Sequence, residues 1–149
     1  MNNEQINEKM ACELKALLEK YNIFHGTRIY FNNKCLHDRN GKIELIENIK
    51  VEEWLEWCNP EMVSMSFEGA NSIYPILNDE CENREMCTKI YNKFLEIGKE
   101  YDRFYEQGQS WNIYYTPKEI TQIVWGAKNK SNKYYYPRKK SKKSKKIEI

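Results

Sequence analysis

Two long amphipathic stretches restrict what this chain can fold into. In each of them, apolar side chains recur three or four positions apart, with charged residues between them. The stripes are Ile6, Met10, Leu14, Leu17 and Leu18 in residues 4–20, and Met86, Ile90, Phe94 and Ile97 in residues 83–99. This spacing places each apolar set on one side of a helix. Each helix therefore needs an apolar surface to cover.

Segments between and after these helices have the composition of strands. The expected strands are residues 27–36, 42–49, 62–67, 101–106 and 111–115. Asn40-Gly41 tolerates positive φ and predicts a hairpin, and the stretch 107–110 predicts a second one. In 62–67, alternation predicts a half-buried strand with Val63, Met65 and Phe67 inside. We expect an α+β fold: four to five mostly antiparallel strands with two long helices packed on one face.

Three shorter elements complete the expected domain. Residues 51–58 predict a short helix that ends before Pro60, because the residue preceding a proline avoids helical geometry. Residues 70–77 predict one or two helical turns. Thr116 and Pro117 predict the start of a last helix, with Thr116 as its N-cap and Pro117 at its first position.

Charge is divided unevenly along the chain. Residues 128–149 hold ten Lys or Arg and one Glu, a net charge of +9. The other 14 of the 24 basic residues and 21 of the 22 acidic residues give residues 1–127 a net charge of −7. We therefore expect an acidic domain, residues 1–127, and a basic tail, residues 128–149, that is mobile alone or ordered on a partner.

The tail combines lysines with a run of tyrosines. Lysines neutralise phosphates, and tyrosines stack on bases. The candidate residues for binding nucleic acid or another partner are Lys133, Tyr134, Tyr135, Tyr136, Arg138, Lys139, Lys140, Lys142 and Lys143. A solubilising terminus and a localisation signal are the alternatives for such a tail, and its composition does not distinguish RNA from DNA.

Acidic side chains also gather around two tryptophans in the domain. Tryptophan beside carboxylates suits docking on a basic protein surface. The candidate docking residues are Trp57, Glu53, Glu56 and Glu61. We expect Trp54 to lie in the core and leave the position of Trp57 open.

The sequence predicts no metal site and no cofactor. The five cysteines are Cys12, Cys35, Cys58, Cys81 and Cys87. Their number is odd, and they lack the paired short spacings of a zinc site. With no signal-peptide pattern and no apolar run of about 18 residues, we expect reduced thiols in a cytoplasmic protein without a membrane contact.

A catalytic centre is also not predicted. Ser64 and Ser66 are flanked by Met65 and Phe67, where a nucleophile elbow requires glycines. The glycines are isolated and form no phosphate-binding loop. We therefore expect a binding protein and not an enzyme. The alternative is an enzyme that acts on a small molecule with His25 or His37, the two histidines, as base.

Two short segments carry a resemblance to a protein group. The run Ser-Met-Ser-Phe-Glu-Gly at 64–69 and the run Ser-Trp-Asn-Ile at 110–113 resemble segments of small phage and mobile-element proteins of low-GC Gram-positive bacteria. The resemblance covers about residues 51–115 and excludes the tail. It implies an accessory protein of the kind that blocks host defences, anti-CRISPR proteins included.

Together these features predict a function and an alternative. We expect an inhibitor of a host nucleic-acid-targeting defence complex that docks on the effector protein or on its RNA. The alternative is a nucleic-acid-binding accessory protein that uses the basic tail. The sequence leaves open the target, the oligomeric state and which part makes the main contact.

Overall fold

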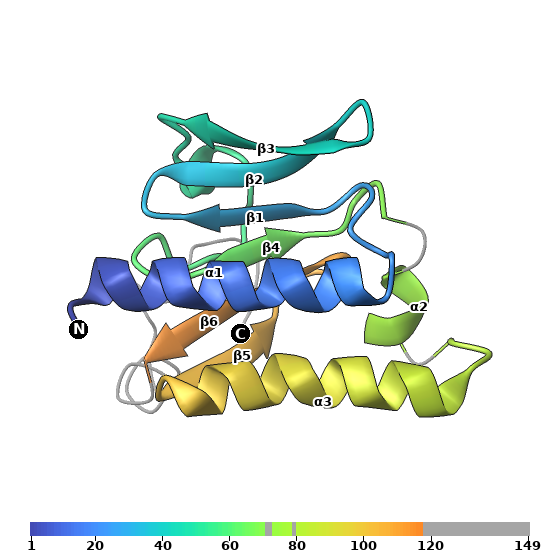
Figure 1. Ribbon diagram of the computed structural model, residues 1–149. Coiled ribbons are helices and arrows are strands. Elements are labelled where there is room, and N and C mark those ends of the chain that lie inside the picture. The colour runs from blue at the N-terminus through green and yellow to red at the C-terminus, as the bar shows by residue number, and fades with distance from the viewer. Residues whose placement is uncertain (71–72, 79, 118–149) are drawn as a thin grey trace.

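The computed structural model describes residues 1–70, 73–78 and 80–117. The helices are α1 (Asn3–Lys20), the 3-10 helix η1 (Val51–Glu53), α2 (Tyr74–Leu77) and α3 (Arg84–Glu100). The strands are β1 (Arg28–Phe31), β2 (Lys34–Arg39), β3 (Lys42–Glu47), β4 (Ser64–Ser66), β5 (Arg103–Gln107) and β6 (Asn112–Pro117). Within this part of the chain they form one antiparallel sheet, in the order β3-β2-β1-β4-β6-β5 (Figure 1). The α+β class and the antiparallel sheet are confirmed, whereas the expected number of strands was too low.

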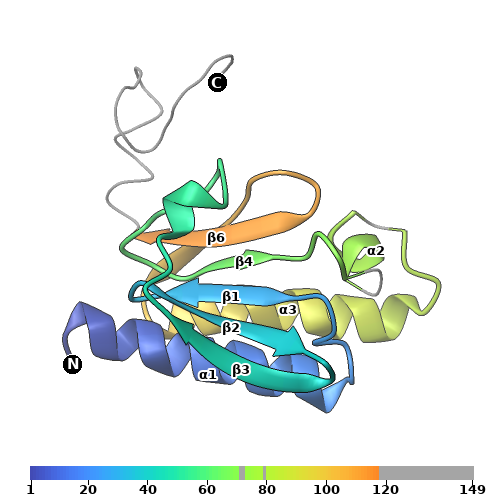
Figure 2. The ribbon, with the colours of Figure 1, turned by 90° about the horizontal axis from the view of Figure 1, so that it is seen from above.

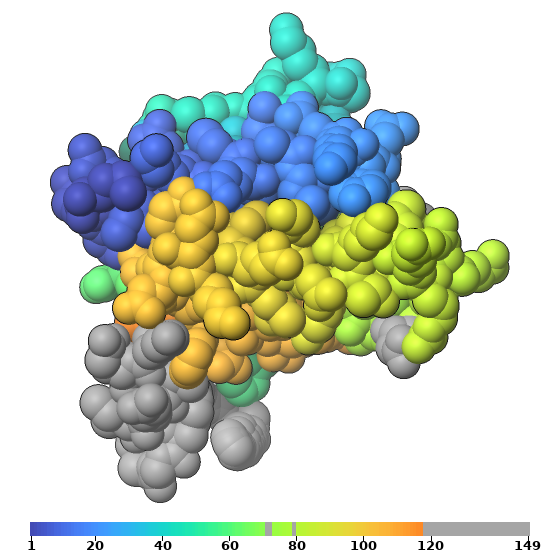
Figure 3. Space-filling view, turned by 60° about the horizontal axis from the view of Figure 1, so that its bottom comes forward, coloured from blue at the N-terminus to red at the C-terminus, as the bar shows by residue number. Residues whose placement is uncertain are grey.

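Helices α1 and α3 lie side by side on one face of the sheet (Figures 1 and 2). Their predicted apolar stripes point inward, and Leu14 of α1 and Phe94 of α3 are fully buried. The sheet contributes Met65 and Tyr115, among others, to the same core. In the space-filling view α1 and α3 meet over their length (Figure 3). The short helix α2 packs against α3, so the helix packing differs in detail from the expected pair.

Asparagine side chains cap the N-termini of both long helices. The Asn2 side chain accepts a hydrogen bond of 2.9 Å from the Gln5 amide, and the Gln5 side chain accepts one of 3.0 Å from the Asn2 amide. At α3, the Asn83 side chain accepts a hydrogen bond of 3.1 Å from the Met86 amide. Such caps satisfy amides that have no partner inside the helix.

The extra strand arises because residues 27–36 form a hairpin and not one strand. Asn32 and Asn33 both have positive φ, 51° and 61°. Two consecutive residues in this conformation make a tight turn whose twist matches the twist of the flanking strands. Phe31 therefore pairs with Lys34 across the turn. The predicted turn at Asn40-Gly41 is confirmed, with φ of 57° and 78°.

Three other expectations need correction. The helix expected at 51–58 is limited to η1. Strand β4 lies inside the sheet and is covered on both faces, so Ser64 and Ser66 are buried as well as Met65. Thr116 and Pro117 are the last residues of β6 and do not start a helix. The helix expected after them, and the boundary between domain and tail at 127, fall outside the described residues.

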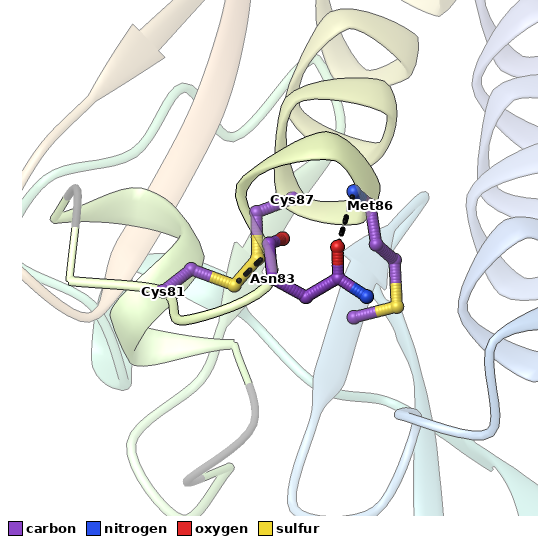
Figure 4. The surroundings of a disulfide bond; sticks show 4 residues. All are labelled: Cys81, Asn83, Met86 and Cys87. Atoms are coloured by element: carbon purple, nitrogen blue, oxygen red, sulfur yellow. Dashed lines mark hydrogen bonds between the residues drawn. A yellow bond between two sulfur atoms is a disulfide. The ribbon is translucent and has the colours of Figure 1, made fainter.

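A disulfide joins Cys81 to Cys87 at the start of α3, with a Cα–Cα distance of 6.4 Å (Figure 4). Asn83, the N-cap of α3, lies between the two cysteines in sequence, and its backbone carbonyl lies 3.4 Å from the Cys81 sulfur. Cys12, Cys35 and Cys58 are free. The expectation of reduced thiols was therefore wrong for one pair.

The face of the sheet turned away from α1 and α3 carries polar side chains. The registers place Cys35 beside Tyr30, Tyr30 beside Ser64, and Ser64 beside Tyr114 across four neighbouring strands. These four side chains are buried, so another part of the chain must cover this face. Among the described helices, none is long and apolar enough to cross a membrane.

Candidate protein-docking site

Residues 48–61 connect β3, at the edge of the sheet, to the region just before β4. We call them the crossover segment. It passes over the face opposite α1 and α3 (Figure 2). The segment contains Trp54 and the four predicted docking residues, which are Glu53, Glu56, Trp57 and Glu61.

Two aliphatic side chains fix the first half of the crossover segment. Val51 and Leu55, four residues apart, are buried against Tyr30 and Cys35 of the sheet. Between them the chain makes one tight turn, in which the Leu55 amide donates to the Val51 carbonyl at 2.8 Å. This small second cluster is separate from the main core under the helices.

The second half is fixed by hydrogen bonds and close packing. The Asn112 side chain donates to the Trp57 carbonyl at 2.9 Å, and the Asn7 side chain of α1 donates to the Glu61 carbonyl at 2.9 Å. Gly108 packs so tightly on Trp57 that an added Cβ would lie 2.4 Å from the Trp57 Cβ. The crossover segment is thus held at both ends and in its middle.

This anchoring turns Trp54 outward. The exposed fraction of its side chain is 56%, and among the large apolar side chains of the described residues only that of Met1 is more exposed. The expectation that Trp54 lies in the core was wrong. A longer helix through residue 58 could have placed Trp54 on a broad apolar side, whereas a single turn anchored by Val51 and Leu55 leaves Trp54 in solvent.

Exposed carboxylates surround Trp54 in sequence, on its turn and directly after it. Glu52, Glu53 and Glu56 are all exposed. The Glu56 side chain accepts a hydrogen bond of 3.3 Å from Gln109 on the β5–β6 loop. With Glu61 and one basic residue, Lys50, the crossover segment has a net charge of −3. An indole within a negative surface can bury its ring against a partner while the rim attracts basic side chains.

The structure brings together only part of the predicted docking set. Glu53 lies on the turn that carries Trp54, and Glu56 directly follows that turn. Glu61 is exposed where the segment reaches α1, and Trp57 is half-buried. Trp54 is the residue that sequence reasoning missed. Its signal was the pair Val51 and Leu55, whose spacing of four could have identified them as the buried side of the turn.

Burial raises the pKa of three groups in and beneath the crossover segment. Desolvation raises the pKa of the Cys35 thiol to about 11 and the pKa of the Cys58 thiol to about 12. It also raises the pKa of Tyr30 to about 12. Both thiols are therefore protonated at neutral pH, and a protonated thiol is a poor nucleophile. These cysteines serve as small apolar contacts in the second cluster.

The two histidines both lie close to β2. His25 is exposed, with its Nδ1 3.3 Å from an Asp38 carboxylate oxygen. His37 is part of β2, and burial, followed by the charges of Arg28 and Arg39, lowers its pKa. In the described residues no group of three His, Cys, Asp or Glu side chains is placed to hold a metal ion.

The candidate residues of the basic tail, from Lys133 to Lys143, lie outside the described residues. Comparison of the chain with protein-family models, with curated proteins and with solved structures finds no match. The crossover segment is thus the candidate site that the geometry itself defines.

Proposed function

We propose that this protein is a non-catalytic binding protein whose crossover segment docks on a basic protein surface. The observation that carries the proposal is the exposed indole of Trp54 on a turn that the rest of the fold holds in place. Tryptophan is enriched among the residues that dominate binding energies at protein interfaces. An indole exposed on a fixed turn loses little freedom when it binds, which favours affinity.

Charge supports a basic partner. The described residues hold 19 acidic and 13 basic side chains, a net charge of −6. Half of that excess resides on the crossover segment, whose net charge is −3. A negative surface attracts a positive one before contact and repels other acidic proteins, so it accelerates association with the matching partner.

Basic protein surfaces of this kind occur where proteins hold nucleic acid. The phosphate backbone is bound mainly by lysine and arginine, which leaves a positive surface on the free protein. Together with the resemblance to phage and mobile-element proteins, this leads to a specific proposal. The protein inhibits a host nucleic-acid-targeting defence complex, in the manner of an anti-CRISPR protein, by occupying the surface that its RNA or DNA would contact.

A second candidate function is supported by the tail. Its net charge of +9 and its three consecutive tyrosines favour a nucleic-acid-binding accessory protein. In that case the tail supplies affinity for RNA or DNA, and the domain acts as its carrier. The two candidates differ in which part of the chain is indispensable.

The test of the first candidate is a pull-down against a panel of RNA-guided nuclease complexes, followed by cleavage assays. We expect the full chain to bind one complex and to reduce cleavage. Trp54→Ala should weaken that binding by about 2 kcal/mol, roughly 30-fold. The matched control is Tyr74→Ala, which removes an aromatic side chain of 40% exposure from α2 and should leave binding unchanged.

Charge is tested with two triple variants that change the net charge equally. Glu52→Gln, Glu53→Gln and Glu56→Gln neutralise the turn, and Gln at 56 still accepts the bond from Gln109. Glu8→Gln, Glu80→Gln and Glu82→Gln neutralise exposed carboxylates elsewhere. Only the first triple should slow association, by about tenfold at low salt. Equal effects of the two triples, or a panel without any binding, would refute the proposal.

A further inference from the structure

Strand β3 forms one edge of the sheet, and its outer side has no partner in the described chain. The two-residue turn at Asn40-Gly41 makes Arg39 and Lys42 a hydrogen-bonded pair, and such pairs alternate along an antiparallel hairpin. In β3, the backbone amides and carbonyls of Ile43, Leu45 and Glu47 therefore point away from β2, toward the open edge. The opposite edge differs, because β5 packs against α3.

The edge lacks most of the usual protection against pairing. Natural edge strands are shielded by proline, by bulges, by charged side chains or by being very short. Of these devices β3 has the charges of Lys42, Glu44 and Glu47. β3 has six residues, no proline and an uninterrupted register with β2. The most exposed aliphatic side chain of β3 is that of Leu45, at 48%. Leu45 pairs with Leu36 of β2, and both side chains point to the side of the sheet that carries the helices. An unpaired strand with an exposed leucine is suited to accept another strand.

The charge distribution favours a second copy of this chain as the source of the strand that pairs with β3. The β2–β3 hairpin, residues 34–47, contains Lys34, Arg39 and Lys42 against Asp38, Glu44 and Glu47, a net charge of zero. The described residues as a whole carry −6. Two acidic domains repel each other over most of their surface, but they can approach at a neutral edge. The Glu44 carboxylate also lies 3.8 Å from Arg39 of the same hairpin.

We propose that β3 pairs in antiparallel orientation with β3 of a second copy, about a twofold axis at Leu45. The sheet then continues through both copies. Residues that face each other in such a pair must point to the same side of the sheet. An axis at Leu45 places the two Leu45 side chains opposite each other and Ile43 opposite Glu47 of the second copy. An axis at Glu44 also satisfies the geometry, but it sets two carboxylates face to face, which is unfavourable.

In this register every outward backbone group is satisfied. The amides of Ile43, Leu45 and Glu47 donate to the carbonyls of Glu47, Leu45 and Ile43 of the second copy. The contact consists of one strand and little more from each molecule, so it is smaller than a standard interface. We therefore expect a weak dimer, with a dissociation constant of roughly 10–100 μM. The pairing does not use Trp54 and is independent of the proposed function.

The first experiment is analytical ultracentrifugation of the full chain at protein concentrations from the low micromolar to the millimolar range. A reversible monomer–dimer equilibrium is expected. Leu45→Lys places two ammonium groups opposite each other and should weaken the dimer at least tenfold. Leu95→Lys, at a leucine of 39% exposure on α3, is the matched control and should leave the equilibrium unchanged. Circular dichroism verifies that both variants fold.

The second experiment locates the axis by cross-linking. In a Cys12→Ser background, which removes an exposed free thiol, Leu45→Cys should form a disulfide-linked dimer under mild oxidation faster than Glu44→Cys does. A chain that remains monomeric throughout, or a Leu45→Lys variant that dimerises as well as the native chain, overturns the proposal. Faster cross-linking through position 44 overturns the Leu45-centred pairing.

Discussion

At the scale of single residues, asparagine determines much of the turn geometry. Positive φ angles occur at six non-glycine residues of the described chain, namely Asn22, Asn32, Asn33, Asn40, Asn48 and Asp102. Asparagine and aspartate adopt this conformation more readily than other side chains, because their short polar groups bond to the nearby backbone. Each of these positions lies close to the end of a helix or strand. These five asparagines and Asp102 therefore mark places where the chain leaves a helix or strand and changes direction.

Two glycines with positive φ allow a matched test of close backbone packing. Gly26 has φ of 82°, and an added Cβ would lie 2.3 Å from the Gly69 carbonyl oxygen. Gly41 has φ of 78° with nothing within 4 Å. Gly41→Ala should therefore cost only the conformational strain, about 1–2 kcal/mol. Gly26→Ala should cost about 2–3 kcal/mol more, because the loops at 26 and 69 must separate.

Urea unfolding of the two glycine variants and the native chain measures this difference, with the comparison made at equal m-values. The destabilisation expected for Gly26→Ala is a large part of the roughly 5–15 kcal/mol that folded domains have in total. If both variants show the same decrease in free energy of unfolding, the close packing of the two loops contributes nothing.

At the scale of elements, the helices were easier to predict than the strands. The apolar stripes of α1 and α3 define their extent to within one residue at each end. Strands β1 and β2 were merged because Asn32-Asn33 lacks the glycine that usually marks a hairpin turn. In the same stretch, apolar residues continue on both sides of the turn and give no indication of a break. Turn chemistry, not strand propensity, decides such a case.

The sequence shows the acidic composition of the candidate docking segment but not the orientation of its side chains. The acidic character of residues 52–61 is visible in the sequence. The orientation of Trp54, in contrast, depends on the side chains of the sheet against which Val51 and Leu55 pack. Tyr30 and Cys35, their contacts, are far away in sequence. No local pattern contains that information. The disulfide between Cys81 and Cys87 was missed for a related reason, since spacing alone does not define a pairing.

The Cys81–Cys87 disulfide should stabilise the start of α3. Closing a loop of this size in the unfolded chain removes an entropy worth about 2 kcal/mol. Reduction, or a Cys81→Ala and Cys87→Ala double variant, should therefore lower the free energy of unfolding by about that amount. Cys12→Ser is the matched control, because Cys12 is free and exposed.

Denaturant unfolding with and without reductant measures the effect, and thiol labelling of the unfolded chain counts the free cysteines. The native chain should become less stable on reduction, and the double variant should not respond. A native chain that labels at all five cysteines before reduction would show that the bond does not form in solution.

For the molecule as a whole, negative charge is concentrated in residues 1–127 and positive charge in residues 128–149. Within the domain, charge is also distributed unevenly between neighbouring surfaces. The crossover segment is acidic, whereas the β2–β3 hairpin is neutral. One surface is therefore suited to attract a basic partner, and another permits contact with a second copy. The two surfaces are consecutive in sequence, since the crossover segment follows β3 directly.

The separation of charge predicts how truncation changes binding. A chain that ends at Ala127 changes in net charge from +2 to −7. If the tail binds nucleic acid, the full chain should bind single-stranded RNA or DNA with an affinity that falls steeply with salt, and truncation should abolish this binding. Binding of a defence complex through Trp54 should survive the same truncation.

Fluorescence anisotropy at several salt concentrations, with full and truncated chains, measures both kinds of binding. Nucleic-acid binding that persists without the tail would assign it to the domain. Truncation that abolishes binding to the effector would instead assign the docking surface to residues 128–149, because the crossover segment is intact in the shorter chain. The two parts of the chain carry opposite charge, so each outcome also predicts the sign of the partner's surface: basic for the crossover segment and acidic or phosphate-rich for the tail.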